Sequence, residues 1–555
     1  MRLLPVLTAP LLIAALLAGC ATPPPPSGPL KVQVLAINDL HGNLLPPKGL
    51  RLPDPAEPSK TVVMEVGGVE ALATAVKQLR KDQPNHIFVA AGDLIGGTPL
   101  LSALFRDEPT IESLSTMGLH VSAVGNHEFD LGRDELLRRQ KGGCHPVDGC
   151  KGPQPFKGAQ FQYLSASTID TATGKTLLPA YLIRRFEGIP VAFIGLTLAG
   201  TPGLVMPTGI QGLRFDDEAQ TVNRLVPELR AQGVESIVVL IHEGGYTTGN
   251  VDECPGLTGQ IEAIVKKFDR AVDLVVTGHT HWAYNCMING MRVTSGHKFG
   301  SMVTDITLTI DRQTRDVIDS QARNILTRLD QFAKDPEQTA LVAGYLDRAQ
   351  PLIERRVGRL EQEIRQTVND PAGNWPMGLL LADAHWAATR APEAGGAEMA
   401  FTNKEGVRAG LTPRADGSVT YGDLFTVQPF SNELITMTLS GREILEILES
   451  QWRSRLGFDP LQPSAGFTYQ WDPKAPVGAK VVPGSVRLNG QPLQMERDYR
   501  VTVNSFVAAG GDGFSLFVRG RNRQTGMLDV QALERYVASQ QVLRAPALDR
   551  IQRLN

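Results

Sequence analysis

Short apolar runs, most of which end in a carboxylate, amide or imidazole side chain, recur between residue 30 and about residue 325. Helical stretches such as VEALATAVKQLRKD at 69–82 separate several of them. The runs are KVQVLAIND, HIFVAAGD, HVSAVGN, VAFIGLT, SIVVLIHEGG and DLVVTGHTH. Near-continuous apolar strands that alternate with helices predict an α/β fold whose sheets are covered by helices. Ligands bind beyond the carboxyl ends of strands in such folds, so the polar residues lie where a site is expected.

The polar side chains at these strand ends form an ordered set. Glycine stands next to several of them and permits the sharp backbone exit that turns a side chain toward a shared centre. Residues i and i+2 of a strand point the same way, so both side chains of Asp-x-His or His-x-His can reach one ion. The candidate ligands are Asp39, His41, Asp93, Asn126, His242, His279 and His281, with His127 beside them. Together they predict a metal site.

The histidines separate into two groups. A lone histidine at a strand end is more often a hydrogen-bonded turn residue than a ligand, but five of the ten histidines fall in these strand ends, interleaved with two aspartates and one asparagine. This clustering favours metal binding over coincidence. The other five lack such neighbours and are expected to be ordinary structural residues: His86, His120, His145, His297 and His385.

The charge balance limits the kinds of partner. The 55 Lys and Arg residues nearly match the 58 Asp and Glu residues, which gives a net charge of −3. No whole-protein field therefore attracts a nucleic acid polymer or an acidic membrane, and an anionic substrate must be held by local charge. The length of 555 residues exceeds what one hydrophobic core serves, so at least two domains are expected.

Residues 1–19 predict a cleaved export signal rather than part of the fold. Arg2 precedes an apolar run from Leu3 to Ala18 that is too short for a stable membrane span. The run ends in Leu-Ala-Gly-Cys, which resembles the bacterial lipoprotein signal with Cys20 as the lipidated residue; a plain secretory signal is the alternative. Residues 20–29 then form a proline-rich linker. By the same resemblance, Ala21 after the cysteine leans toward a periplasm-facing outer-membrane lipoprotein.

Four cysteines remain after Cys20, and an even number in an exported chain suggests disulfides. The favoured pairs are Cys144 with Cys150 and Cys254 with Cys286, because each pair keeps to one stretch of loop. A zinc knuckle from Cys144, His145 and Cys150 is the alternative, although it offers only three ligands.

The strand and helix signals divide the chain into segments. Residues 30–325 carry the alternating strands and helices of the first domain. Residues 326–355 read as helix, and we expect them to connect the domains; the apolar residues at helical spacing there are Leu341, Tyr345, Leu346, Ala349 and Ile353. Residues 356–555 mix helices such as SGREILEILESQW with strands such as YRVTVNSF, which predicts a second, α+β domain.

The ordered strand-end set resembles the calcineurin-like metallophosphoesterases, whose fold is a β-sandwich flanked by helices. The resemblance covers five blocks over about 250 residues and implies two divalent metal ions, which could be zinc, manganese, iron or cobalt. It implies one metal on Asp39, His41, Asp93 and His281, and the second on Asp93, Asn126, His242 and His279. It also implies that His127 stabilises the transition state and that Asp130, at the start of a helix, orients it; Glu128 fits a helix-terminal acid as well as a catalytic one.

Three motifs of the second domain resemble the substrate domain of 5′-nucleotidases. They are TNKEGVR at 402–408, VQPFSNE at 427–433 and NSFVAAGGDGF at 504–514. By this resemblance Phe430 and Phe506 would stack on the two faces of a nucleobase, and Asp512 would bind the ribose. Asn403 and Arg408 match the nucleoside and phosphate contacts of the family.

The sequence departs from the family pattern in two places. The usual Asn-Gly-Gly-x-x-Arg reads Asn403-Lys404-Glu405-Gly406-Val407-Arg408, which puts extra charge beside the pocket. A further family arginine has no counterpart in the stretch NDPAGNWPMGLLLADAHW, and Arg365 lies too far upstream to assign. Substrate preference is therefore less constrained than reaction type.

The resemblance implies an enzyme that hydrolyses nucleoside 5′-monophosphates to nucleoside and phosphate in nucleotide catabolism, as a lipid-anchored protein of the bacterial cell envelope. A 2′,3′-cyclic nucleotide phosphodiesterase or a UDP-sugar diphosphatase with the same metal site is the alternative within enzymes. A non-catalytic surface lipoprotein is the alternative of another class. The oligomeric state stays open.

Overall fold

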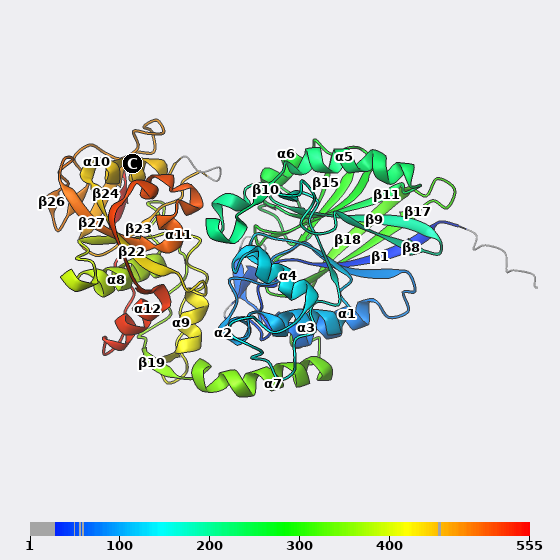
Figure 1. Ribbon diagram of the computed structural model, residues 1–555, viewed down its shortest axis with the longest axis horizontal. Coiled ribbons are helices and arrows are strands. Elements are labelled where there is room, and N and C mark those ends of the chain that lie inside the picture. The colour runs from blue at the N-terminus through cyan, green and yellow to red at the C-terminus, as the bar shows by residue number, and fades with distance from the viewer. Residues whose placement is uncertain (1–27, 49, 55–56, 58–59, 453–456) are drawn as a thin grey trace, which may run out of the picture.

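The computed structural model describes residues 28–48, 50–54, 57, 60–452 and 457–555. They form an N-terminal and a C-terminal domain that lie side by side, with helix α7 (Pro336–Ile353) along one edge of the molecule (Figure 1). The predicted signal segment, Cys20 and most of the proline-rich linker lie outside the described residues. None of the described helices combines the length and the apolar character needed to cross a membrane.

Two six-stranded sheets make up the centre of the N-terminal domain. Four strands in each are parallel neighbours, and antiparallel strands complete the edges. The first sheet has the order β18 (Val317–Leu326), β17 (Met302–Ile310), β1 (Leu30–Ile37), β4 (His86–Ala90), β5 (Val121–Ala123), β6 (Gln162–Leu164). The second has the order β15 (Ala283–Ile288), β16 (Met291–Gly296), β14 (Val272–Thr277), β11 (Ser236–His242), β9 (Ile189–Thr197), β8 (Tyr181–Phe186). All six strand runs of the sequence are therefore strands.

The two sheets pack face to face, which explains why their strands are apolar almost without a break. Along β1, Val32 and Val34 point into the layer between the sheets, where they meet residues of the second sheet such as Phe193 and Leu240. Leu35, the residue after Val34, packs instead toward the helices on the outer face. A strand buried on both faces leaves few positions for polar residues, so most of the polar side chains stand where the strands end.

Helices cover the outer face of each sheet (Figure 1). On the first sheet these are α1 (Val69–Leu79), α3 (Glu108–Met117) and α4 (Arg133–Lys141), which join its hydrophobic core cluster. On the second sheet they are α5 (Glu218–Ala231) and α6 (Gln260–Val265). The result is the predicted sandwich flanked by helices.

The expectation of helix throughout 326–355 is wrong for its first ten residues. Leu326 still belongs to β18, and the chain then turns until α7 begins at Pro336. The side chain of Asp335 caps the helix by accepting the backbone N–H groups of Glu337 and Gln338, and Pro336 is suited to the first helical turn, where its missing N–H costs nothing. The helix buries Tyr345 and Ala349 against the N-terminal domain.

The C-terminal domain is built around a five-stranded and a four-stranded sheet. The first has the order β23 (Gln462–Pro463), β20 (Met399–Thr402), β27 (Asp498–Asn504), β22 (Glu433–Ser440), β28 (Arg521–Leu528). The second has the order β26 (Gln491–Pro492), β25 (Arg487–Leu488), β24 (Phe467–Trp471), β29 (Ile551–Arg553). Helices pack around them: α8 (Pro376–Thr389), α9 (Tyr421–Val427), α10 (Gly441–Ser450), α11 (Ser505–Ala508) and α12 (Asp529–Ala538).

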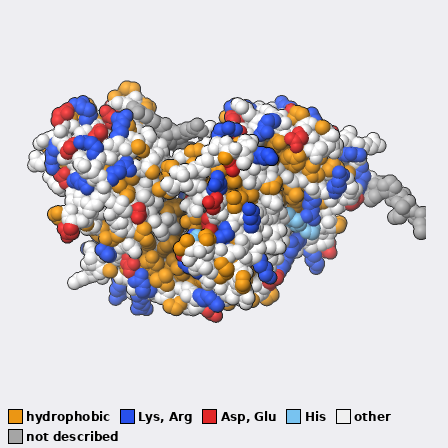
Figure 2. Space-filling model, viewed as in Figure 1, with side chains coloured by type: hydrophobic (Ala, Val, Ile, Leu, Met, Phe, Trp, Pro, Cys, Tyr) orange, Lys and Arg blue, Asp and Glu red, His pale blue; other side chains and the backbone are white. Residues whose placement is uncertain are grey.

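Two disulfides join Cys144 to Cys150 and Cys254 to Cys286, as favoured from the sequence. The alternative zinc knuckle is thereby excluded, because its two thiol ligands are bonded to each other. Figure 2 shows Lys and Arg side chains interspersed with Asp and Glu side chains on the face drawn, in keeping with the near balance of charge.

We predict that His385 makes the protein acid-sensitive. The ring is fully buried in α8, and burial lowers its pKa to about 4, although a contact with Gln428 opposes the shift. The unfolded chain binds a proton near pH 6.5, whereas the folded chain does not. Stability is therefore lost as the pH falls from 6.5 toward 4, by on the order of 2 kcal/mol at pH 5.

Urea unfolding of the wild type and of His385→Gln at pH 7 and pH 5 checks this. The difference in free energy of unfolding between the two pH values should shrink by about 2 kcal/mol in the variant. Equal pH differences in the two proteins would contradict it.

Candidate metal centre

The seven candidate ligands come together where strands of both sheets end. Asp39 and His41 follow β1, Asp93 follows β4, and Asn126 follows β5 in the first sheet. His242 is the last residue of β11, and His279 and His281 follow β14 in the second sheet. The carboxyl ends of these parallel strands lie at the same end of the sandwich, so residues up to 242 positions apart meet there.

The backbone at five of these residues is in the left-handed region, which side chains with a Cβ rarely occupy. The φ angles are 50° for Asp39, 46° for His41, 48° for Asp93, 69° for His279 and 56° for His281. Such conformations cost of order 1–3 kcal/mol each and persist only where the surrounding structure enforces them. Their concentration on the predicted ligands marks this strand edge as the functional centre.

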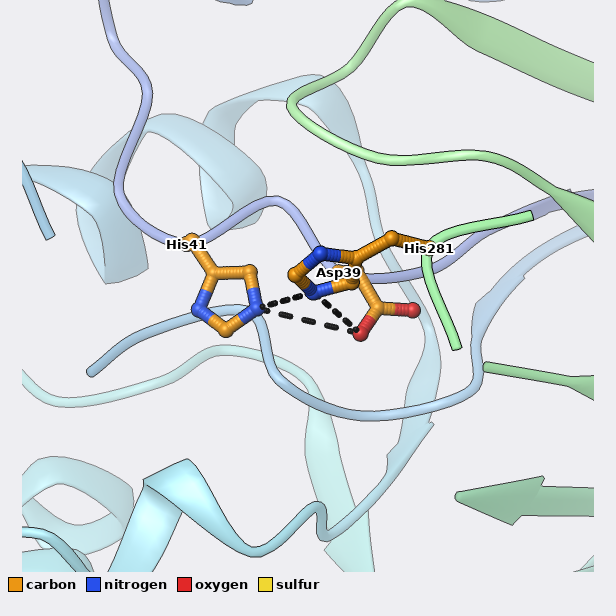
Figure 3. Close-up of side chains that lie close together, drawn as sticks. All are labelled: Asp39, His41 and His281. Atoms are coloured by element: carbon orange, nitrogen blue, oxygen red, sulfur yellow. Dashed lines mark hydrogen bonds and ion pairs between the residues drawn. The ribbon is translucent and has the colours of Figure 1, made fainter. Parts of the chain in front are cut away.

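Asp39, His41 and His281 form the first cluster (Figure 3). The Nε2 atoms of His41 and His281 lie 3.0 Å apart, and Oδ1 of Asp39 lies 3.8 Å from the first and 3.4 Å from the second. Nδ1 of His41 lies 2.7 Å from the carbonyl oxygen of Gly96, so Nδ1 is the donor and Nε2 carries the lone pair. Three electron-pair donors thus point at one spot.

Asp93, His242 and His279 form the second cluster. Nε2 of His242 lies 2.9 Å from Oδ2 of Asp93, and Nδ1 of the same ring lies 2.8 Å from the carbonyl oxygen of Ala91. Oδ2 of Asp93 is also 3.7 Å from Nε2 of His41, a member of the first cluster. Asp93 therefore stands between the two clusters, where the predicted bridging ligand is needed.

These residues fit a pair of divalent cations. The side-chain oxygen of Asn126 is buried without a hydrogen-bond partner among the described residues, which is costly unless a cation meets it. Neutral imidazole, carboxylate and amide groups are the donors that zinc, manganese, iron and cobalt accept. Nothing in the donor set selects among these metals.

The electrostatics of the clusters favour positive charge. Burial opposes the ionisation of Asp39 and Asp93, but hydrogen bonds and charges from the neighbouring histidines outweigh it and lower both pKa values. Burial lowers the pKa of His41 and of His281, which leaves these rings neutral and able to coordinate. Asp93 overcomes burial at His242 and raises its pKa to about 10. The carboxylates thus attract a cation, whether proton or metal.

His127 stands beside the clusters but faces the opening. Its Nδ1 atom lies 2.9 Å from Oδ2 of Asp130, and burial, which disfavours the charged ring, is outweighed by Asp130 and Asp93, so the pKa of His127 is raised. Asp130 follows the short 3-10 turn η1 (His127–Phe129) instead of starting a helix as expected, and α4 begins only at Arg133. The predicted His–Asp contact nevertheless forms.

Glu128 has a structural task that the sequence reading missed. Its carboxylate is fully buried and accepts backbone N–H groups of Asp93 (3.0 Å), Leu94 (2.9 Å) and Gly125 (2.6 Å). It therefore joins the loop after β4 to the loop after β5. The close approach of these two loops also explains why residue 125 is a glycine, since a Cβ there would lie 2.1 Å from Oδ1 of Asp93. In the sequence, the feature that could have indicated this role is that an acidic residue directly follows two site residues, Asn126 and His127.

Asn38 is a second residue that the sequence reading missed. Its amide donates to Oδ2 of Asp39 at 2.7 Å and to the carbonyl oxygen of His297 at 2.5 Å, so it orients the first carboxylate. The five histidines outside the strand ends have ordinary hydrogen-bond partners: Gln83 for His86, Phe88 for His120, Asp148 for His145, Ser301 for His297 and Gln428 for His385.

A cleft of about 1810 Å³ separates the two domains above the clusters. Its walls include His127, Asp93 and His281 from the N-terminal domain. All five candidate substrate residues line it from the C-terminal domain: Asn403, Arg408, Phe430, Phe506 and Asp512. The candidate residues of both domains thus face one space.

The C-terminal residues fall into two groups within this cleft. Arg408 and Phe430 reach the metal centre: Nη2 of Arg408 lies 3.5 Å from Nε2 of the ligand His41, and the ring of Phe430 stacks on that of His127 at 5.6 Å. Asn403 donates to Oδ2 of Asp512 at 2.7 Å, so these two residues form a hydrogen-bonded pair. Burial, followed by the charge of Glu405, raises the pKa of Asp512 to about 8.

Phe506 and Arg365 both line the cleft. The Phe506 ring packs so closely on the chain that a Cβ at Gly511 would lie 2.4 Å from it. Arg365, left unassigned from the sequence, also lines the cleft, but it lies 3.5 Å from Glu363 and stays largely exposed. The Lys404 ammonium lies 3.8 Å from Glu405, so these two added charges partly cancel.

We predict that Glu128 supports metal binding without touching the metal. Replacing an outer partner of a metal site lowers metal affinity roughly 10–100-fold. Glu128→Gln should do so, because one end of the amide cannot accept an N–H group. Competition against a chromophoric chelator measures it. Glu108→Gln is the matched control, since Glu108 is buried in the same domain but pairs with Arg138. Equal affinities for wild type and Glu128→Gln would refute the role.

Two family models match the chain, one in each domain. The model described as calcineurin-like phosphoesterase matches residues 32–283, which include every candidate metal ligand. The model described as 5′-nucleotidase, C-terminal domain matches residues 356–519, which include every candidate substrate residue.

Relatives with both halves occur among bacterial proteins. Endonuclease YhcR of Bacillus subtilis is 33% identical over 93% of this chain, but the chain spans only 40% of its length. The 5′-nucleotidase of Vibrio parahaemolyticus is 25% identical, with 95% of this chain and 93% of that protein covered. The crystal structure of a 5′-nucleotidase precursor from Thermus thermophilus superposes with a TM-score of 0.77 at 26% identity, over 95% of this chain and all of that one. The chain belongs to the 5′-nucleotidase family of calcineurin-like metallophosphoesterases.

Proposed function

We propose that the protein hydrolyses nucleoside 5′-monophosphates to nucleoside and phosphate, with two divalent metal ions at the candidate centre. The observation that carries this proposal is the single cleft between the domains, which joins the metal-ligand clusters to Arg408, Phe430, Asn403 and Asp512. A phosphate at the clusters would leave the nucleoside pointing toward the C-terminal domain. The 5′-nucleotidase relatives support the same substrate class.

The metals would be held as the sequence suggested. Asp39, His41 and His281 would bind one ion, and Asn126, His242 and His279 would bind the other. Asp93 would contact both. When bound, such a pair supplies neutralisation of the phosphoryl oxygens and a lower pKa for water.

The chain's own groups handle the phosphate and the proton. Arg408 carries a planar guanidinium that can bind two phosphoryl oxygens at once. His127, whose pKa is raised by Asp130 2.9 Å away, can in its protonated form donate a hydrogen bond to the phosphate or a proton to the departing 5′ oxygen. Phe430 covers the His127 ring and excludes water from one side of it.

The nucleoside would be held by residues of the C-terminal domain. The carboxyl group of Asp512 and the amide of Asn403 are already joined by a hydrogen bond and can bind ribose hydroxyls without first being ordered. The aromatic rings of Phe430 and Phe506 offer faces on which a base can stack, at roughly 1–3 kcal/mol per base for either purine or pyrimidine.

Phosphate release from a substrate panel tests the proposal. The panel contains AMP, GMP, CMP and UMP, together with 2′,3′-cyclic AMP and UDP-glucose. We expect the monophosphates to be the best substrates, the chelator-treated protein to be inactive, and zinc, manganese, iron or cobalt to restore turnover. If the protein instead preferred 2′,3′-cyclic AMP or UDP-glucose as its substrate, the proposed hydrolysis of monophosphates would be wrong and the alternative activity would take its place.

Two substitutions test the assigned roles. His127→Gln should lower kcat by roughly 10²–10⁴-fold, as loss of a proton donor does, while metal content stays that of the wild type. Asp93→Asn should lower metal content itself. A His127→Gln protein with wild-type kcat on AMP would contradict the catalytic assignment, and a metallated protein inert toward the entire panel would contradict the function.

We also propose that the protein is a lipid-anchored envelope protein with Cys20 as the modified residue. The segment Leu17-Ala18-Gly19-Cys20 and the proline-rich stretch behind it support this. In cells labelled with a radioactive fatty acid, the wild type should carry label and fractionate with membranes, and Cys20→Ala should do neither. Label on Cys20→Ala, or an unlabelled wild type, would refute the anchor.

A further inference from the structure

Most basic side chains that line the cleft are already neutralised by a carboxylate. The ion pairs are Lys48–Asp423, Arg51–Glu363, Arg106–Asp148, Arg139–Asp107, Arg365–Glu363, Lys404–Glu405 and Arg414–Glu354. Within the part of the chain that the structure describes, Lys298 and Arg408 are the cleft-lining cations with no such ion pair. The sequence reading expected a role for Arg408 but none for Lys298.

The loop that carries Lys298 is fixed against the first metal-ligand cluster. It follows β16, and its neighbours on both sides have left-handed backbones, with φ of 63° at His297 and 59° at Phe299. The N–H of Phe299 donates to the carbonyl oxygen of Asp39 at 2.8 Å, and the amide of Asn38 donates to that of His297 at 2.5 Å. Lys298 is thus held between two anchored residues.

Among the described residues, the ammonium group of Lys298 has no hydrogen-bond acceptor and no ion pair. It lies over the ring of Phe299, whose centroid is 4.7 Å away. That ring lies 6.1 Å from the ring of His41 and 6.0 Å from that of His281, so the charge stands beside the first cluster. Burial lowers the pKa of Lys298 to about 8, which leaves the ammonium form dominant at pH 7. A partly buried charge without a counter-ion is unfavourable unless a ligand supplies one.

Arg408 approaches the same cluster from the other domain, 3.5 Å from His41. The two charges repel each other, since the charge of Arg408 contributes to lowering the pKa of Lys298. Asp39 and Glu405 offset part of the charge on Lys298, but neither Lys298 nor Arg408 is in an ion pair among the described residues. Two like charges beside one cluster are suited to an anion of more than one charge.

We propose that Lys298 is a specificity-determining residue that, together with Arg408, selects doubly charged phosphate monoesters over singly charged diesters. The inference rests on the proposed function and extends it from reaction to substrate class. A phosphate monoester carries close to two negative charges at neutral pH, because its second pKa is near 6, whereas a diester carries one. Only the monoester has enough charge to compensate both side chains.

The test compares p-nitrophenyl phosphate with bis(p-nitrophenyl) phosphate at pH 7, because the two substrates share a leaving group and differ in charge. Lys298→Met should lower kcat/KM for the monoester by roughly 10–100-fold, the loss of one hydrogen bond between charged groups, and that for the diester by less than about 3-fold. Lys298→Arg, which keeps the charge, should retain most of the preference. Lys404→Met is the matched control and should leave the ratio unchanged.

Inhibition by inorganic phosphate adds a binding measurement. Its inhibition constant should rise in Lys298→Met and stay near the wild-type value in Lys298→Arg. Equal losses on the two p-nitrophenyl substrates, or an unchanged inhibition constant, would overturn the inference. Neither substrate contains a nucleoside, so a failure of the nucleotide panel and a failure of the Lys298 inference are separate results.

Discussion

Repulsion between electron-pair donors is the constraint around which the N-terminal domain is arranged. Two buried carboxylates, Asp39 and Asp93, face imidazole nitrogens at distances between 2.9 and 3.8 Å. Buried charge of this density is costly unless hydrogen bonds and cations meet it. Backbone N–H groups of His279 and His127 donate to the two carboxylates, and Asn38 donates to the first. The remaining lone pairs point at the positions that two metals would take.

The sandwich supplies the rigidity that this arrangement demands. Five ligands have left-handed backbones, so the loops would relax if they were free. They are not free, because each follows a strand that is buried on both faces between helices and a second sheet. Glu128 adds a direct link between two loops by accepting three backbone N–H groups. Strain at the site is thus offset by packing elsewhere in the domain.

The cleft brings together two sets of chemical groups, each of which belongs to a different domain. The N-terminal wall carries the donor atoms, and the C-terminal wall carries Arg408, Phe430 and the Asn403–Asp512 pair. Arg408 and Phe430 already touch His41 and His127, so the described arrangement has the domains close enough for one substrate to meet both walls. Helix α7 packs on the N-terminal domain and also contacts α9 of the other, which makes it part of the join between them.

The sequence by itself determined the strands and the polar residues that gather at their ends, because apolar runs followed by a polar exit are local patterns. The sandwich followed from the resemblance of that ordered set to a known family. Local patterns also have limits. The pattern of residues 326–355 predicts a helix, yet Leu326 pairs in a strand and the helix begins only after its cap at Asp335.

Only the tertiary structure decided which side chains share a space. Glu128 reads as a helix-terminal acid, and its three N–H partners appear only when the loops after β4 and β5 are side by side. Lys298 has no motif around it, and the absence of an ion pair to it within the described residues depends on neighbours that lie far away in the chain. Sheet order and the approach of the second domain place those neighbours, because contacts across such distances depend on packing and not on local spacing.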